Sequence, residues 1–117
     1  MEAKEFIQKL DPKNSYWEMR CGIMTQLNRV SINPNNVWVV FWCSFCDGEN
    51  GTEYHAVPYT KLKVDEEGDY VVCCPNNPEG RLENYVSGDC IPDKLKELFK
   101  KTKFEKYVEP NGSDNDF

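Results

Sequence analysis

The run VWVVFWC at residues 37–43 constrains the fold more than any other part of the sequence. It holds only β-branched, aromatic and cysteine side chains, which pack well on a pleated sheet and are poor helix formers. Residues 52–57 resume an alternating pattern after a turn-forming sequence with two glycines. The sequence therefore predicts that residues 37–43 and 52–57 pair as an antiparallel hairpin in a mainly β domain.

Short strand and turn patterns follow on both sides of this hairpin. Residues 18–24 alternate apolar and polar side chains and predict a strand, followed by a long loop of Asn, Pro and Ser residues. Pro58 cannot donate to a sheet, so YTKL after it predicts one tight turn, and KLKV and YVVCC predict two short strands. Residues 75–91 are rich in Asn, Pro, Gly and Ser and predict a long surface loop. Residues 2–10 fit either a helix or a strand.

A basic helix is predicted near the C-terminus. IPDKLKELFKKTKFEKYV opens with a Pro-Asp helix start, and its Leu and Phe residues recur at helical spacing to make one apolar stripe. The chain of 117 residues has the usual length of one domain. We therefore expect a single domain at residues 1–109 and a disordered acidic tail at residues 110–117.

Composition narrows the location and the partners of the protein. No apolar run approaches the roughly 20 residues that span a bilayer, and the N-terminal sequence is too acidic and too interrupted for a secretory signal. The six cysteines are therefore expected to be reduced thiols of a nuclear or cytosolic protein. The formal net charge of −6 disfavours attraction of the whole surface to nucleic acid. Residues 94–106, however, carry six lysines and only two glutamates, so one end of the molecule is basic.

Four stretches of the sequence, in their order along the chain, resemble the PWWP domain. SYWE at residues 15–18 stands where the family has its Pro-Trp-Trp-Pro signature, and VWVVFWC looks like its third strand. YHAVPYTKLKV at residues 54–64 is similar to its fourth strand, single turn and fifth strand, and FKKTKFEKYVEP at residues 99–110 looks like the helix behind the barrel. The chain departs from the family at Glu18, which replaces the final proline, at Cys43, which replaces a glycine, and in the long connection before the helix.

This resemblance implies a fold and a function. The fold is a small five-stranded Tudor/PWWP-like β-barrel with an extra hairpin and a C-terminal α-helix. The function is that of a chromatin reader in the nucleus, which holds a methylated lysine of a histone tail in an aromatic cage. Each ring face attracts such a weakly hydrated cation by about 0.5–2 kcal/mol, so the chemistry supports the idea.

The candidate cage residues come from the positions of this sequence that match the family's ligand-facing residues, and from their neighbours. They are Trp17, Phe41, Asn14 and Tyr16. Asn14 stands at the third wall, so Tyr16, Trp42 or an insertion within LDPKNSYW at residues 10–17 would have to supply the missing ring. The other interpretation is that Trp17 and Phe41 belong to the core, where Trp38 and Trp42 are expected.

PWWP domains also touch DNA phosphates through lysines near the barrel and the helix. The lysines that match in this chain are Lys61, Lys63, Lys100, Lys101 and Lys103. Any DNA contact is expected to be weak, non-specific and sensitive to salt. The alternative is a solvated face, which the net charge of −6 favours unless these lysines lie beside the cage.

The cysteines support a competing interpretation. Cys43 and Cys46 have the Cys-x-x-Cys spacing that places two thiolates on one metal ion. The residues that could complete four ligands are Cys73, Cys74, Cys90 and His55. Neighbouring strand residues point to opposite faces, so Cys73 and Cys74 do not both serve. One of these two together with Cys90 would have to serve, and the ligand set of this alternative interpretation is Cys43, Cys46, Cys74 and Cys90.

The alternative function is therefore a zinc-stabilised protein-interaction domain that binds no methyl-lysine. Without zinc the thiols pack as small apolar side chains or stay free on loops, and no cofactor is expected. Catalysis is not expected either, because His55 is the single histidine and no oxyanion-forming motif or phosphate-binding glycine loop accompanies it. A redox role for CSFC would need a helix after the first thiol, whereas DGENG predicts a turn. We expect a monomeric binding module.

Overall fold

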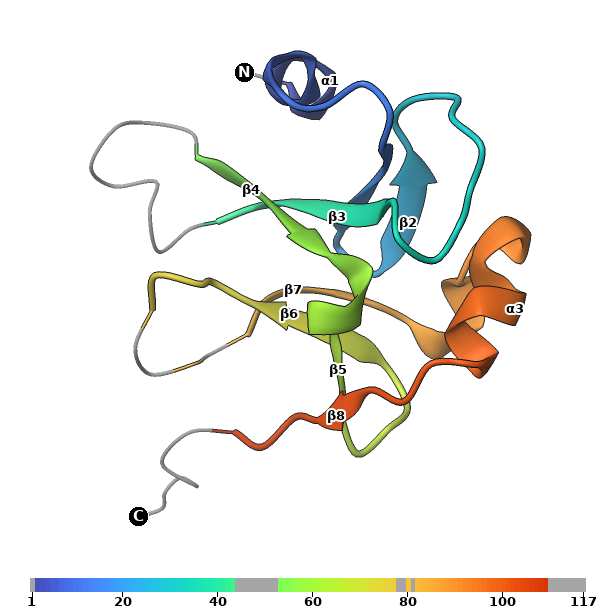
Figure 1. Ribbon diagram of the computed structural model, residues 1–117. Helices are drawn as coiled ribbons and strands as arrows, with labels where there is room; N and C mark the ends of the chain where they lie inside the picture. The colour runs from blue at the N-terminus through green and yellow to red at the C-terminus, as the bar shows by residue number, and fades with distance from the viewer. Residues whose placement is uncertain (1, 44–52, 78–79, 81, 110–117) are drawn as a thin grey trace.

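The strands form two four-stranded sheets, shown in Figure 1. The computed structural model describes residues 2–43, 53–77, 80 and 82–109. Sheet A has the strand order β2-β1-β3-β4 and sheet B the order β7-β6-β5-β8. The strands of sheet A are β1 (Ser15–Arg20), β2 (Ile23–Gln26), β3 (Val37–Trp42) and β4 (Tyr54–Pro58). The strands of sheet B are β5 (Lys63–Val64), β6 (Tyr70–Cys73), β7 (Leu82–Val86) and β8 (Glu105–Lys106).

A mainly β fold is therefore confirmed, but the predicted five-stranded barrel is not. Within the described ranges the strands make two separate sheets and close into no barrel. The predicted acidic tail at residues 110–117 lies outside the described residues.

Sheet A begins with a tight hairpin rather than the single strand predicted at residues 18–24. β1 and β2 pair antiparallel with Arg20 opposite Ile23, so the chain reverses at Cys21 and Gly22. Both turn residues have positive φ, 50° at Cys21 and 95° at Gly22, as a two-residue type I′ turn requires. The prediction was wrong because the apolar-polar alternation continues through the turn, and only the glycine marks it.

β3 is a central strand of sheet A. Its antiparallel pairing with β4, with Phe41 opposite His55, confirms the predicted hairpin. Its pairing with β1 is parallel, so the chain crosses over between β2 and β3. Asn28 fastens this crossover, because its side chain accepts a hydrogen bond from the Tyr16 backbone N–H at 2.9 Å and donates one to the Asn14 carbonyl at 2.8 Å.

Residues 2–10, which fitted either a helix or a strand, are helical. They form α1 (Ala3–Phe6) and the 3-10 helix η1 (Ile7–Lys9). Ala3 packs with Tyr16 and Val40 on the face of sheet A that turns away from sheet B, which we call the outer face. The tight turn predicted after Pro58 is the 3-10 helix η2 (Tyr59–Lys61), and the two short strands predicted after it are β5 and β6.

The predicted C-terminal helix is confirmed as α3 (Asp93–Lys100), which buries Leu95 and Phe99. The segment at residues 99–110, which was expected to be the helix behind the barrel, is a correction: of its described residues only the first two belong to α3, and the chain then continues into β8, which pairs parallel to β5. None of the helices in the described part of the chain is long and apolar enough to cross a membrane.

The long loop predicted at residues 75–91 is partly wrong, because it contains β7 and the 3-10 helix η3 (Gly88–Cys90). β7 pairs antiparallel with β6, and Tyr70 lies opposite Val86. β7 is an edge strand with Glu and Asn among its residues, so its sequence alone does not indicate a strand. Its pairing with β6 stabilises it as one.

The main core lies between the two sheets and under α3. Met19 and Phe41 from sheet A, Val86 from sheet B and Leu95 from α3 are fully buried in one cluster. The sheets also meet through the backbone of Gly22, whose N–H donates to the Tyr85 carbonyl at 3.0 Å. This core fixes which face of β3 and β4 points inward, and therefore which side chains are available for function.

Candidate functional site

The two residues predicted as cage walls, Trp17 and Phe41, lie inside the main core. Their exposed fractions are 2% and 0%, respectively. The Trp17 indole N–H donates to the Ser15 hydroxyl at 2.9 Å, and the Phe41 ring centroid lies 5.5 Å from that of His55. A cage has to leave its ring faces open to the ligand. The structure therefore corrects this assignment, because both rings lie on the inner face of sheet A and are buried where it packs against sheet B.

The other two predicted cage residues hold the N-terminal segment against the outer face of sheet A. Tyr16 is buried, and its hydroxyl donates to the Asp11 carbonyl at 3.0 Å. The Asn14 side-chain amide donates to the same hydroxyl at 3.4 Å. Both residues thus have local structural contacts, and neither lines the aromatic pocket described next.

An aromatic and acidic pocket opens on the outer face, with a volume of about 420 Å³. Trp42 of β3 and Tyr54 of β4 are direct cross-strand partners, and both are half-buried. They share the pocket with the carboxylates of Glu18 on β1 and Glu2 next to α1. The remaining lining residues are Met19, Arg20, Cys21 and Asn84. We call this set the outer pocket.

Electrostatics make the outer pocket unfavourable for negative charge. The pKa of Glu18 is raised, mainly because burial disfavours its carboxylate; Arg20 opposes this rise and Glu2 adds to it. The pKa of Tyr54 is raised by burial and by the negative charges of Glu18 and Glu2. A positive ligand would relieve these penalties.

The sequence did not predict the outer pocket, because Trp42 was considered only as a substitute third ring beside Trp17 and Phe41 and was otherwise expected in the core. The signal was available in the alternation of β3, because Phe41 and Cys43 point inward and the residue between them points outward. Antiparallel pairing then puts Tyr54 opposite Trp42.

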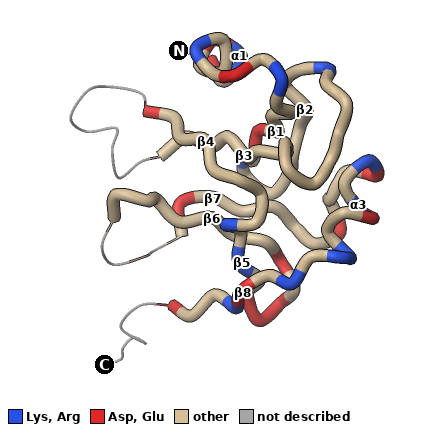
Figure 2. The backbone as a smooth tube through the Cα atoms, in the orientation of Figure 1, with Lys and Arg blue, Asp and Glu red and all other residues tan. Residues whose placement is uncertain are grey.

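The five lysines predicted to touch DNA do not line the outer pocket and lie on η2, on β5, at the end of α3 and in the segment that follows α3. Lys63 is half-buried and the other four are exposed. Figure 2 shows basic positions along β5 and on the segment from α3 to β8, with acidic positions of the β5–β6 turn beside them. Lys100 lies 3.8 Å from Glu97. The lysines therefore do not surround the pocket, and DNA contact stays a prediction.

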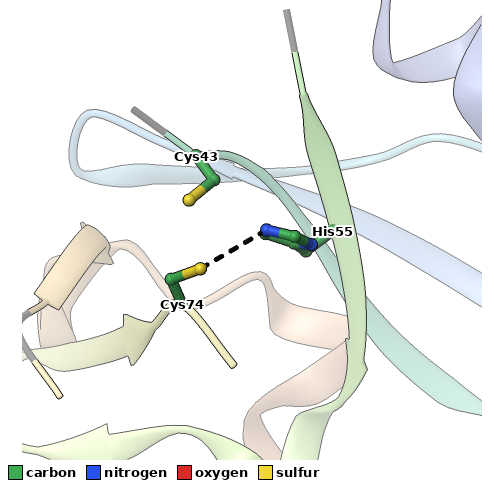
Figure 3. A group of neighbouring side chains, drawn as sticks. All are labelled: Cys43, His55 and Cys74. Carbon is green, nitrogen blue, oxygen red and sulfur yellow. Dashed lines mark hydrogen bonds between the residues drawn. The ribbon is translucent and has the colours of Figure 1, made fainter. Parts of the chain in front are cut away.

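Two of the predicted zinc ligands come together with the single histidine, as Figure 3 shows. The ligand atoms of Cys43, His55 and Cys74 all lie within 4.8 Å of one another. Cys90 is exposed in η3 and belongs to no such group among the described residues, whereas His55, which was also considered as a ligand, lies beside the two cysteines. Cys46 lies outside the described residues.

The neighbours Cys73 and Cys74 point in different directions, as predicted for adjacent strand residues. The Cys73 thiol is half-buried and donates to the Gly80 carbonyl at 3.2 Å, whereas Cys74 is buried in the core. Burial raises the pKa of the Cys73 thiol. The pKa of His55 is lowered, mainly by burial, while Glu53 and Glu83 oppose this change.

Comparisons of the chain with protein-family models, with curated proteins and with solved structures found no match.

Proposed function

We propose that this chain is a binding module that holds a cationic side chain in the outer pocket, and that its ligand is a methylated lysine of a histone tail, as the PWWP resemblance implies. The observation that carries the proposal is the cross-strand pair of Trp42 and Tyr54 beside the partly buried carboxylate of Glu18. The proposal keeps the expected reader function and replaces Trp17 and Phe41 as the aromatic walls. The PWWP-like barrel itself stays a prediction.

The chemistry of the pocket suits a weakly hydrated cation. A methylammonium group gains about 0.5–2 kcal/mol from each favourable ring face, and a carboxylate adds direct attraction between opposite charges. Glu2 and Glu18 outweigh the single positive charge of Arg20, so the pocket keeps a net negative charge. The pocket and the expected ligand therefore carry opposite charges and attract each other.

Glu18 also sets an expected order among methylation states. Mono- and dimethyl-lysine keep at least one N–H that can donate a charge-assisted hydrogen bond to a carboxylate, whereas trimethyl-lysine keeps none. An all-aromatic cage would favour the trimethyl form, since it needs only ring faces. We therefore expect the outer pocket to prefer mono- or dimethyl-lysine.

The test is a titration of the labelled full chain with one histone-tail peptide in five forms: unmodified, mono-, di- and trimethylated, and acetylated at the same lysine. We expect the mono- or dimethylated peptide to bind most tightly and the neutral acetylated peptide to bind most weakly. Equal affinity for the methylated and acetylated peptides would contradict the proposal, because it would show that no cation is recognised.

A matched pair of tryptophan variants locates the binding. Trp42→Ala removes one wall of the outer pocket, while Trp38→Ala removes a half-buried tryptophan from the same face of the same strand, outside the pocket. Trp42→Ala is expected to weaken the best peptide severalfold to about thirtyfold, the equivalent of one ring face. Trp38→Ala is expected to leave affinity within about twofold, and an equal loss in both variants would place the ligand elsewhere.

A further inference from the structure

A thiol-imidazole-thiol cluster lies between the two sheets, separate from the outer pocket (Figure 3). Cys43 follows β3, His55 is in β4 and Cys74 follows β6. The two cysteines have exposed fractions of 0% and 3%, while His55 is half-buried. We propose that Cys43, His55 and Cys74 hold a structural zinc ion that ties sheet A to sheet B.

The spacing of the three ligand atoms fits tetrahedral coordination. With Zn–S of about 2.3 Å and Zn–N of about 2.0–2.1 Å, a sulfur and a nitrogen ligand lie about 3.5 Å apart, and two sulfur ligands about 3.8 Å apart. The Cys74 sulfur lies 3.5 Å from the His55 Nε2 atom. All three ligand atoms lie within 4.8 Å of one another, so small side-chain movements bring them onto one ion.

The donor set selects the metal. Two thiolates and one imidazole are soft and intermediate ligands, which suit zinc, whereas calcium and magnesium take oxygen ligands. His55 is the most exposed of the three ligands, since it is half-buried and both cysteines are buried. The three described residues supply three of the four ligands that a tetrahedral zinc site takes.

Neighbouring groups orient the ligands. The Asn76 backbone N–H donates to the Cys74 sulfur at 3.3 Å and so helps to hold this side chain in place. The Asn77 N–H donates to the Cys74 carbonyl at 3.1 Å and closes the turn that presents this sulfur. The Phe41 ring packs on the imidazole from the directly opposite position of β3. Such supporting contacts are what hold metal ligands in place.

The first experiment measures metal in the untagged full chain, purified under reducing conditions. We expect about one zinc per chain by elemental analysis. After exchange for cobalt, we expect the visible absorption of a tetrahedral site together with thiolate-to-cobalt charge-transfer bands. A chain that carries no zinc and gives no thiolate-to-cobalt band overturns the proposal.

Variants then assign the ligands, with exposed cysteines as matched controls. Cys74→Ser and His55→Ala are expected to lose zinc, whereas Cys21→Ser and Cys90→Ser are expected to keep it. Zinc retained in both ligand variants, or lost equally in the controls, overturns the proposal.

A rescue variant covers the case in which Cys74→Ser does not fold. His55→Cys replaces one zinc ligand by another, so it should keep the metal and strengthen the thiolate-to-cobalt bands. If these bands do not change relative to the wild type, His55 is no ligand and the proposal is wrong.

Stability gives a readout that does not depend on any substitution. A site that exists only in the folded chain makes metal binding part of folding, so a strong chelator should lower the melting temperature of the wild-type chain. Restored zinc should bring the melting temperature back. A chain shown to have lost its zinc, yet melting unchanged, would overturn the structural role.

Discussion

The two faces of the β3–β4 hairpin differ in almost every physical property, although their residues alternate along the same two strands. The inner face carries Phe41, Cys43 and His55, and it packs against sheet B. The outer face carries Trp42 and Tyr54, which stay half-buried beside carboxylates. Phe41 and Trp42 are neighbours in the sequence, yet the first ring is buried in the core and the second is partly exposed on the outer face.

This difference teaches that residue type alone does not assign a role in a small β domain. Aromatic residues occur on both faces, and the parity of their positions decides which of them face a partner. If the two faces are independent, a substitution on the inner face should mainly change the stability of the domain, and one on the outer face should mainly change peptide affinity. The following predictions test that separation.

The largest effect is expected for Phe41→Ala. Truncation of a fully buried phenylalanine leaves a cavity and costs about 3–5 kcal/mol of the free energy of unfolding. Denaturant unfolding measures this loss. A loss below about 1 kcal/mol, together with abolished peptide binding, would mean that Phe41 faces a ligand after all and would break the comparison.

A smaller loss of stability is expected for Trp42→Ala, because its side chain is only half-buried. We expect Trp42→Ala to lower the free energy of unfolding by about 1–2 kcal/mol. Its peptide affinity should fall much more than that of the Phe41→Ala variant, when both are measured on folded protein. Denaturant unfolding and peptide titration on the same sample give both values. The comparison fails if Trp42→Ala destabilises the chain as much as Phe41→Ala does.

The smallest effect concerns pH and Glu18. Folding raises the pKa of Glu18, so this carboxyl favours the folded state below its ordinary pKa, and that contribution is lost as the pH rises through its folded pKa. A bound cation favours the carboxylate, so affinity for the methylated peptide should rise over the same pH range and then level off.

The matched variants are Glu18→Gln and Glu66→Gln, the second of which changes an exposed carboxyl in the β5–β6 turn. Glu18→Gln is expected to flatten the pH dependence of peptide affinity, whereas Glu66→Gln should keep it. Titrations from below the ordinary glutamate pKa up to neutral pH check this. Identical pH profiles for all three proteins would remove Glu18 from the proposed site.

The central hairpin was predictable because its information is local. Residues 37–43 have a strand composition that leaves little alternative, and two glycines mark the turn. β7 was not predictable, because an edge strand with polar residues depends on a partner that is distant in sequence. The reversal at Cys21 and Gly22 was missed for the opposite reason: a two-residue turn leaves the local alternation intact.

The candidate sites divide in the same way. In the alternative interpretation Cys43 was named as a metal ligand from its Cys-x-x-Cys spacing, and Cys74 as one of two adjacent cysteines of which strand parity allowed only one. His55 could have been preferred to Cys90 from the hairpin alone, because pairing of β3 with β4 brings residues 43 and 55 close together. The position of Cys90 in η3 depends on β7 and could not be read locally. The burial of Trp17 and Phe41 depends on which face of sheet A meets sheet B, which no local pattern contains.

The backbone link at Gly22 has a consequence for how the opening of this molecule can be followed. Gly22 donates to the Tyr85 carbonyl and accepts from the Ser87 N–H, each at 3.0 Å, so two amides span the sheets. Both become accessible to solvent only when sheet A separates from sheet B, whereas amides within a hairpin report that hairpin. In native-state hydrogen exchange, the Gly22 and Ser87 amides should therefore share one opening free energy. That value measures the cohesion between the sheets apart from the stability of either one.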